Sequence, residues 1–251
     1  MIYRFAAAAV VLGMSASASL AAVELYPANA PLPPTAYGWL AVSQAPAPAA
    51  VPTPWPDFTI GAGQSVLVST MADRGGYGGL IYTGVPLSPT QNTLQFHLSL
   101  VSSEVFLLGV GRRAGLSLLL LNGDARGVEL GFWPDRIFSQ EVGFFAIGEE
   151  VLHTPFDPTN ATAYYLTLLA TTYELRMGST LLLTGPLRDY SATPTVFGPV
   201  YSQSNFLFIG DNTTRGAASF DFGRMAVVPE PAAVALLGPA SVLLLRRRRV
   251  R

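Results

Sequence analysis

The chain contains no cysteine and no lysine, and its only histidines are His97 and His153. Without cysteine there is no disulfide, no thiolate nucleophile and no cysteine-ligated zinc site. Charge is also scarce, because charged residues make up 12% of the sequence. Between residues 22 and 228, nine arginines and 15 acidic residues leave a net charge of −6. This balance argues against nucleic acid as a partner, since a basic stripe would be expected.

Residues 57–228 also lack any convincing helix of three turns, and short apolar segments alternate there with Gly, Asn, Asp and Pro. Leu94–Leu100 alternates apolar and polar residues, which is typical of a strand buried on one face, whereas Leu118–Leu121 is apolar throughout and indicates burial on both faces. Strands are expected at residues 37–42, 65–70, 80–83, 93–101, 105–110, 116–121, 128–133, 142–147, 164–170, 172–177, 180–184, 206–209 and 219–227. Short strands at this spacing predict an all-β chain with one antiparallel sandwich.

Two turns in this region predict hairpins. Gly178 and Ser179 separate residues 173–177 from residues 180–184, and glycine in the first place favours a type II′ turn. Residues 122–127 form a longer, glycine-containing loop between two further strands.

Residues 22–56 differ in composition from the rest of the body. Nine prolines and many alanines lie between Tyr26 and Pro56, so much of this segment is expected to be extended or loosely ordered. We therefore predict a Pro/Ala-rich segment at residues 22–56, followed by the β-sandwich domain at residues 57–228.

The first 21 residues predict a secretory signal peptide. Arg4 supplies the positive charge, Phe5–Met14 is an apolar run, and Ser19 and Ala21 are small residues at positions −3 and −1 of a cleavage site. We expect export through the Sec machinery and cleavage after Ala21 by signal peptidase.

The end of the chain, residues 229–251, has three parts in order. Pro229, Glu230 and Pro231 come first, and the two prolines prevent a regular strand or helix. Residues 232–245 carry no charge. As a single hydrophobic helix they would reach about 21 Å, which is short of the roughly 30 Å hydrocarbon core of a membrane. The last part is an arginine cluster that is expected to stay cytoplasmic, made of Arg246, Arg247, Arg248, Arg249 and Arg251.

This ending resembles the PEP-CTERM sorting signal, in which a Pro-Glu-Pro motif precedes a short transmembrane segment and a terminal arginine cluster. The resemblance implies a Gram-negative bacterium whose exosortase recognises the tail and cleaves near Pro229–Pro231. It also implies a transient stay in the inner membrane before release to the cell surface or the extracellular matrix. An ordinary tail anchor is the alternative, but an anchor does not require the Pro-Glu-Pro motif.

The body resembles concanavalin A-like (laminin G-like) jelly rolls. Tyr164–Gly185 is similar to the late strands of that fold, and Phe206–Asp211 followed by Ala218–Val227 is similar to its closing strands. The resemblance implies a fold and leaves activity open, because fold does not fix function.

No residue pattern in the body marks a catalytic site. His97 is expected on the polar face of its strand, and His153 in a loop before Pro155. The Glu-x-Asp-x-Glu strand that retaining glycosidases of this fold carry is missing, and the adjacent Glu149 and Glu150 would point to opposite faces of a strand. We therefore predict no catalytic residue and a chain that is not an enzyme.

Calcium and sugar stacking are two weaker possibilities. Asp211, Asn212 and Asp221 are candidate calcium ligands, although the first two are better explained by turn chemistry, so no cofactor is predicted. Candidate aromatic platforms for sugar rings are Trp39, Trp55, Trp133, Tyr77 and Tyr190. Packing in the core or at its rim is the more ordinary role for such residues.

These observations favour an exported, exosortase-sorted surface or matrix protein. Its role would be non-catalytic carbohydrate binding or a structural contribution to biofilm, with exopolysaccharide as the candidate partner. The alternative is a polysaccharide-acting hydrolase on the same fold. Ice or surface binding has only the sorting tail behind it, because no regular Thr-x-Thr array is present.

Overall fold

The computed structural model describes residues 22–28, 30–44, 58–61, 64–68, 74–80, 91–105, 113–142, 147–153, 162–191, 199–213 and 216–228. The predicted signal peptide, the predicted sorting signal and Trp55 lie outside these residues. Within the described part of the chain, no helix is long and apolar enough to cross a membrane.

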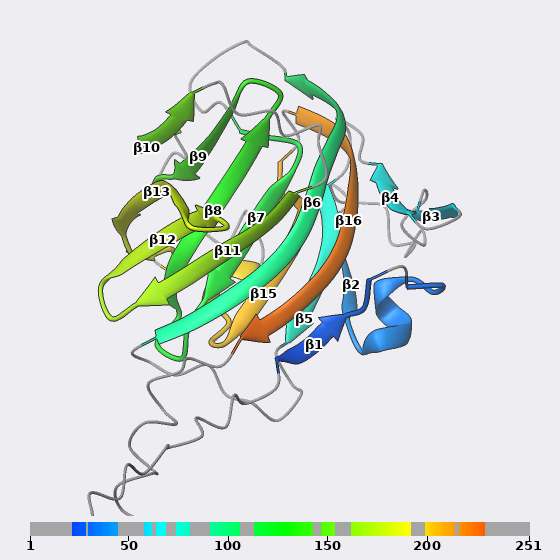
Figure 1. Cartoon of the computed structure of the whole chain (residues 1–251), viewed down its shortest axis with the longest axis horizontal. Helices are drawn as coiled ribbons and strands as arrows, with labels where there is room; N and C mark the ends of the chain where they lie inside the picture. The colour runs from blue at the N-terminus through cyan, green and yellow to red at the C-terminus, as the bar shows by residue number, and fades with distance from the viewer. Residues whose placement is uncertain are drawn as a thin grey trace, which may run out of the picture. The chain divides into compact units, whose positions relative to one another are not determined.

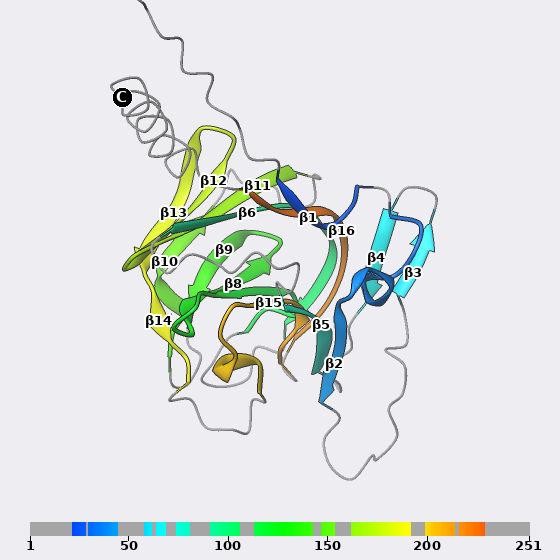
Figure 2. The same ribbon diagram turned by 90° about the horizontal axis from the view of Figure 1, so that it is seen from below.

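In the described residues, two antiparallel sheets of eight strands each pack against one another around a shared core, which confirms the predicted β-sandwich (Figure 1, Figure 2). Sheet A has the strand order β13-β12-β11-β6-β16-β4-β3, and β1 also pairs with β16. Sheet B has the order β10-β9-β8-β7-β15-β5-β2, and β14 also pairs with β8.

The strands of sheet A are β1 (Val23–Tyr26), β3 (Phe58–Gly61), β4 (Gln64–Val68), β6 (Gln91–Val105), β11 (Thr162–Leu169), β12 (Thr172–Met177), β13 (Thr180–Pro186) and β16 (Gly216–Val228). Those of sheet B are β2 (Leu40–Gln44), β5 (Arg74–Leu80), β7 (Ser117–Leu121), β8 (Arg126–Trp133), β9 (Arg136–Gln140), β10 (Ile147–His153), β14 (Arg188–Asp189) and β15 (Phe206–Asp211). The described residues also include the short 3-10 helices η1 (Pro34–Tyr37) and η3 (Pro199–Ser202).

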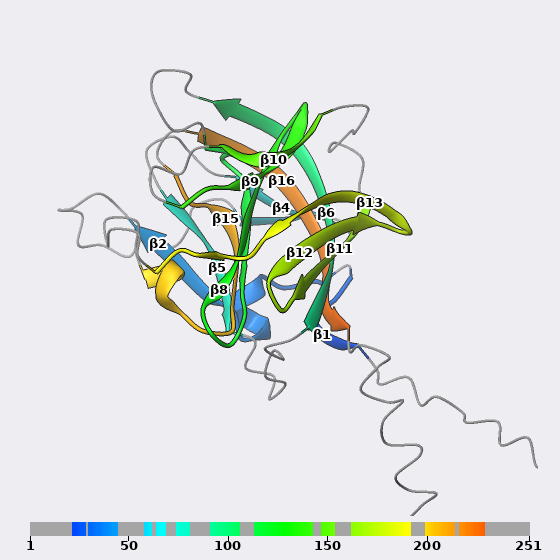
Figure 3. The same cartoon turned by 90° about the vertical axis from the view of Figure 1, so that its left-hand side faces the viewer.

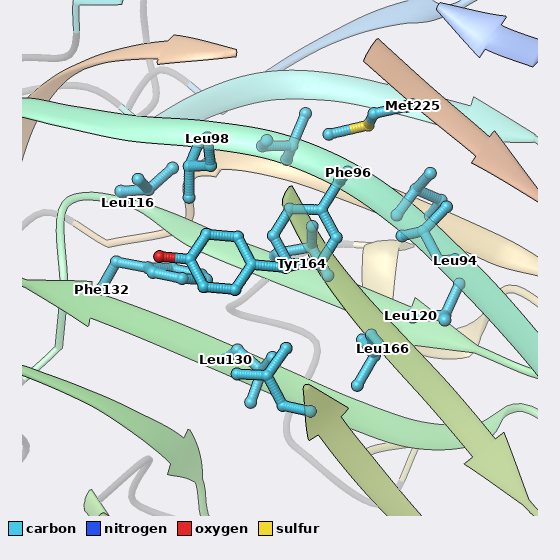
Figure 4. Close-up of a cluster of buried hydrophobic side chains, with 14 of the residues drawn as sticks. Leu94, Phe96, Leu98, Leu116, Leu120, Leu130, Phe132, Tyr164, Leu166 and Met225 are labelled. Carbon is cyan, nitrogen blue, oxygen red and sulfur yellow. The ribbon is translucent and has the colours of Figure 1, made fainter. Parts of the chain in front are cut away.

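The core lies between the inner faces of the two sheets. Strand β6 alternates as predicted, and its inward side chains are Leu94, Phe96, Leu98 and Leu100. Phe96 stacks on Tyr164 with 5.2 Å between ring centroids and meets Phe132 edge-on at 6.4 Å (Figure 4). Burying each such side chain contributes about 1.5–3 kcal/mol, so this aromatic group is a main source of stability.

Part of the outer face of sheet B is buried as well. Strand β7 sends Leu118 and Leu120 into the core and Leu119 and Leu121 to the other side, which confirms the predicted burial on both faces. On that outer face a second apolar cluster forms under Tyr190 and η3; its members are Leu119, Leu121, Tyr190, Val200, Tyr201, Phe206 and Phe208. Segments after β14 therefore cover this part of sheet B.

The predicted hairpin at Gly178-Ser179 is present between β12 and β13 (Figure 3). Met177 pairs with Thr180, Gly178 has φ +56°, and Ser179 is not among the residues with positive φ. A positive φ at the first central residue alone fits the type II′ turn. The loop at residues 122–127 also joins two paired strands, β7 and β8.

The prediction that the sandwich begins at residue 57 is wrong. Strand β1 pairs with β16, and β2 pairs with β5. Tyr26 and Trp39 are core residues, and the Trp39 Nε1–H donates to the carbonyl of Leu25 at 2.8 Å. Two large aromatic side chains in this segment outweighed the local effect of its prolines.

Strand β9 was not predicted. The strand expected at residues 142–147 falls mostly on residues 143–146, which lie outside the described residues, and β10 runs over Ile147–His153. Pro134 and Asp135 separate the paired residues Trp133 and Arg136, so β8 and β9 form a two-residue hairpin. His153 is the last residue of β10 and pairs with Arg136, so its predicted place in a loop is also wrong.

Candidate functional site

The outer face of sheet A differs from that of sheet B because many of its described side chains are polar and partly exposed. Alternation along β6 sends Gln95 and His97 to this face, opposite the core residues Phe96 and Leu98. His97 thus lies on the polar face, as predicted.

Strand β11 adds the next row of this face. Tyr165 pairs with Gln95, and Thr167 pairs with Thr93. The hydroxyl groups of the two threonines lie 2.8 Å apart. Because directly opposite side chains in an antiparallel pair are close, this register brings the Tyr165 hydroxyl to the amide of Gln95.

A β-bulge in β16 completes the site. Phe222 pairs with Leu98 and Met225 with Phe96, so Gly223 and Arg224 together oppose the single residue His97. A Cβ atom at Gly223 would lie 3.3 Å from the His97 Cβ, so the glycine leaves space beside the histidine. Bulges of this kind redirect a side chain, and they are frequent next to functional sites.

Four side chains therefore meet here, and we call Gln95, His97, Tyr165 and Arg224 the sheet A site. The Gln95 Nε2 lies 3.5 Å from His97 Nε2 and donates to the Tyr165 hydroxyl at 3.4 Å. Arg224 Nη1 donates to Gln95 Oε1 at 3.5 Å, and its Nε donates to Glu24 at 3.0 Å. The three contacts among the four residues are at the long limit of hydrogen bonding, so these polar groups can still form stronger hydrogen bonds with a ligand.

The histidine of this site is neutral near pH 7. Its pKa lies below the ordinary value of 6.5, first because partial burial disfavours the charged ring and second because Arg224 is nearby. A neutral imidazole has one donor and one acceptor nitrogen, so His97 can exchange hydrogen bonds with a hydroxyl group in either direction.

A second polar cluster, the buried network, lies on the outer side of sheet B. Arg113 Nη2 donates to Glu129 Oε1 and to the Tyr201 hydroxyl, both at 2.8 Å, and that hydroxyl donates to Glu129 Oε2 at 2.6 Å. Asn212 Nδ2 donates to the Tyr201 hydroxyl at 2.5 Å. All four residues are buried, and the short distances indicate a structural role in holding η3 against β8.

Burial acts on the pKa values in this network. Burial alone would lower the pKa of Arg113, but the Glu129 carboxylate and Tyr201 raise it on balance. Burial, partly offset by the charge of Arg113, holds the pKa of Tyr201 well above its ordinary value. Neither Arg113 nor Tyr201 therefore titrates near pH 7.

The calcium candidates are not brought together. Asp211 ends β15 in sheet B, and its Oδ1 accepts the Thr213 N–H at 2.9 Å, which is the predicted turn chemistry. Asn212 belongs to the buried network, whereas Asp221 lies on β16 in sheet A. Among the described residues, no group of three histidine or acidic side chains could hold a metal ion.

A third cluster joins the sheets at one edge. Glu150 on β10 accepts from Arg188 Nη2 at 2.6 Å and from the Ser139 hydroxyl. Burial would raise the pKa of Glu150, but the hydrogen bonds from Ser139 and Arg188 lower it on balance. Burial also raises the pKa of the neighbouring Tyr173 to about 12. An ionised carboxylate locked by an arginine is poorly suited to act as the general acid of a glycosidase.

The candidate aromatic platforms that lie in the described residues are not at the surface. Trp39, Trp133, Tyr77 and Tyr190 are all buried, and packing is therefore their role in the described structure. Tyr190 also donates from its hydroxyl to the carbonyl of Gln140 at 2.6 Å.

Sequence reasoning missed three of the four residues in the sheet A site. Alternation along Leu94–Leu100 could have paired Gln95 with His97, because both occupy its polar positions. The partnership with Tyr165 and Arg224 depends on strand pairings across about 70 and 129 positions, the separations of their contacts with Gln95. No local pattern specifies such pairings, and the bulge in β16 leaves no signal beyond Gly223 itself.

No family model matches the chain, and no curated protein matches it in sequence. Similar solved structures include a β-glucanase of Bacillus licheniformis, at 8% identity and a TM-score of 0.41 over 68% of this chain and 82% of that chain. An alginate lyase is similar at 12% identity and a TM-score of 0.38, over 67% of this chain and 80% of that chain. A protein of Saccharomyces cerevisiae described as functionally unknown has 10% identity and a TM-score of 0.39, over 76% and 97% of the two chains. TM-scores this low support no statement about activity or ligand.

Proposed function

We propose that the chain is an exported, exosortase-sorted surface or matrix protein that binds carbohydrate without cleaving it, on a body of the concanavalin A-like jelly-roll type. The ligand would lie on the outer face of sheet A, at Gln95, His97, Tyr165 and Arg224. Exopolysaccharide is the partner that suits a protein of the cell surface or extracellular matrix.

The observation that carries this proposal is the contrast between two sets of polar contacts. In the buried network, the hydrogen bonds of Tyr201 with its three partners are 2.5–2.8 Å long. In the partly exposed sheet A site, Gln95 meets its three partners at 3.4–3.5 Å. Amide, imidazole and hydroxyl groups that are only weakly hydrogen-bonded suit sugar hydroxyls, which both donate and accept hydrogen bonds.

The pairing of the two ends of the body supports the proposed processing. Val23 pairs with Val227, so the chain enters and leaves sheet A at the same place. Cleavage after Ala21 and cleavage near Pro229–Pro231 would both leave β1 and β16 intact. The sandwich could thus remain folded through both processing steps.

A glycan array probed with the full chain tests the proposed binding. We expect retention on one class of glycan and about a tenfold loss of affinity in Gln95→Ala, because a lost hydrogen-bond partner costs about 1–3 kcal/mol. Gln203→Ala is the matched control, since Gln203 is an exposed glutamine on the η3 side of the molecule. Equal binding by the two variants, or no retained glycan, would refute the proposal.

The same experiment addresses the alternative of a polysaccharide-acting hydrolase. A hydrolase releases new reducing ends from the retained glycan, whereas a binding protein leaves its length unchanged. Release of reducing ends that Glu150→Gln abolishes would favour the hydrolase.

A further inference from the structure

We propose that the glycan is acidic and that Arg224 and Arg176 bind its carboxylate groups at the two ends of one row of side chains. This inference rests on the proposed carbohydrate binding and names the class of ligand. The row crosses β16, β6, β11 and β12 and contains Arg224, Gln95, Tyr165 and Arg176.

The strand pairings place these four side chains in line. Tyr165 lies opposite both Gln95 on β6 and Arg176 on β12, and Arg224 reaches Gln95 from the bulge in β16. Neighbouring strands are about 4.8 Å apart, so the two arginine-bearing strands are separated by about 14 Å. A chain of sugar rings laid across the strands would therefore contact both arginines along its length.

Both arginines are held in partly exposed ion pairs. Arg224 Nε donates to Glu24 at 3.0 Å, with side-chain exposures of 34% and 46%. Arg176 Nε donates to Glu174 at 2.9 Å, with exposures of 36% and 31%. Partly exposed pairs of this kind contribute little to stability, so a ligand carboxylate can replace either glutamate at little cost.

The chemistry of the row distinguishes an acidic from a neutral sugar. Guanidinium groups match carboxylates with two parallel hydrogen bonds, whereas a sugar hydroxyl gains little from a cation. Between the two arginines, Gln95, His97 and Tyr165 offer neutral partners for the hydroxyl groups of the same chain. Charged ends with a neutral middle fit an acidic polymer whose carboxylates reach the two arginines while its hydroxyl groups meet the residues between them.

The acidic surroundings limit the affinity without removing it. Asp221 shares this face with Glu24 and Glu174, and the body carries a net charge of −6. Screening reduces the effect of charges farther away than about 8 Å at physiological salt, so the nearby arginines dominate at the site. Binding should accordingly weaken as salt is added.

The test compares polygalacturonate with its carboxyl-reduced form, because the two polymers differ only at the carboxylate. We expect the full chain to bind polygalacturonate at least tenfold more tightly. Arg224→Gln and Arg176→Gln should each weaken that binding severalfold and leave the melting temperature nearly unchanged. Arg136→Gln is the control, since Arg136 also forms an exposed pair, with Asp135, but lies on sheet B.

Glu24→Gln should change the affinity for polygalacturonate in the opposite direction. Removing this competitor should strengthen polygalacturonate binding, an effect that a merely structural role of the Arg224–Glu24 pair would not produce. Equal binding of the two polymers, an equal loss in Arg136→Gln, or weaker binding in Glu24→Gln would overturn the inference.

Dextran sulfate and dextran separate a sulfate ester from a carboxylate as the anionic group. Binding of dextran sulfate without binding of polygalacturonate would overturn the carboxylate assignment. Binding of neutral glycans alone would overturn the inference while the proposed carbohydrate binding stands. Failure of every glycan tested would refute both.

Discussion

At the scale of single residues, the environment of His97 is the most informative feature of the sheet A site. Its ring faces Gln95 on its own strand, and the charged and titratable groups nearest on adjacent strands are Tyr165, Arg224 and Asp221. Partial burial and the arginine both disfavour the charged ring. The site thus presents a neutral imidazole to a ligand at neutral pH.

This environment predicts the titration of His97 by NMR. We expect a midpoint below 6.5 in the folded chain, and a rise toward that value in Arg224→Gln, because only the contribution of burial remains. Because the pKa of His97 is lower in the folded chain, its contribution to folding stability is fully present above pH 6.5 and is lost as the pH falls below that value. A midpoint at or above 6.5 would contradict this account.

For the buried network, we predict a large loss of folding stability when one member of its ion pair is replaced. Glu129→Gln removes the charge that compensates Arg113, and breaking a buried pair from one side destabilises a fold by about 3–5 kcal/mol. The free energy of unfolding in urea measures this loss. Glu174→Gln is the matched control, because its pair with Arg176 is partly exposed and contributes about 0–1 kcal/mol. Similar losses in the two variants would show that the network is not the stronger contact.

At the scale of strands and turns, two glycines at hairpin ends allow the cost of backbone strain to be compared with the cost of a steric clash. Gly178 has φ +56°, and a Cβ there would meet nothing within 4 Å. Gly178→Ala should therefore cost only the roughly 1–2 kcal/mol of a left-handed residue. A Cβ at Gly127 would overlap the carbonyl oxygen of Leu120, so Gly127→Ala should cost more. Thermal unfolding of the two variants checks the order, and a reversed order would contradict it.

The elements that were predicted correctly are those that a local sequence pattern specifies. Leu94–Leu100 carries its own alternation, Leu118–Leu121 its own apolar run, and Gly178-Ser179 its own turn. Strand β1 was missed because its partner, β16, lies about 200 positions away, the separation of the Glu24–Arg224 contact. The sheet A site could not be predicted from the sequence for the same reason, since three strands far apart in sequence contribute to it.

At the scale of the whole molecule, the pairing of β1 with β16 brings the ends of the folded body together. The proposed processing then has a defined product. In its native host, the mature protein should begin at Ala22 and lack Arg246–Arg251, since the sorting signal is removed near Pro229–Pro231. Intact mass spectrometry of the surface fraction measures both ends. A surface species that retains the arginine cluster would contradict exosortase sorting.

The central claim is that sheet A, and not sheet B, carries the binding face. NMR shift mapping of the full chain with its array-selected glycan tests this claim most directly. We expect perturbed amides at Gln95, His97, Tyr165 and Arg224 and unchanged amides around Leu119 and Tyr201 on the outer side of sheet B. Perturbations gathered around Leu119 and Tyr201, with none along β6, β11 and β16, would contradict the account.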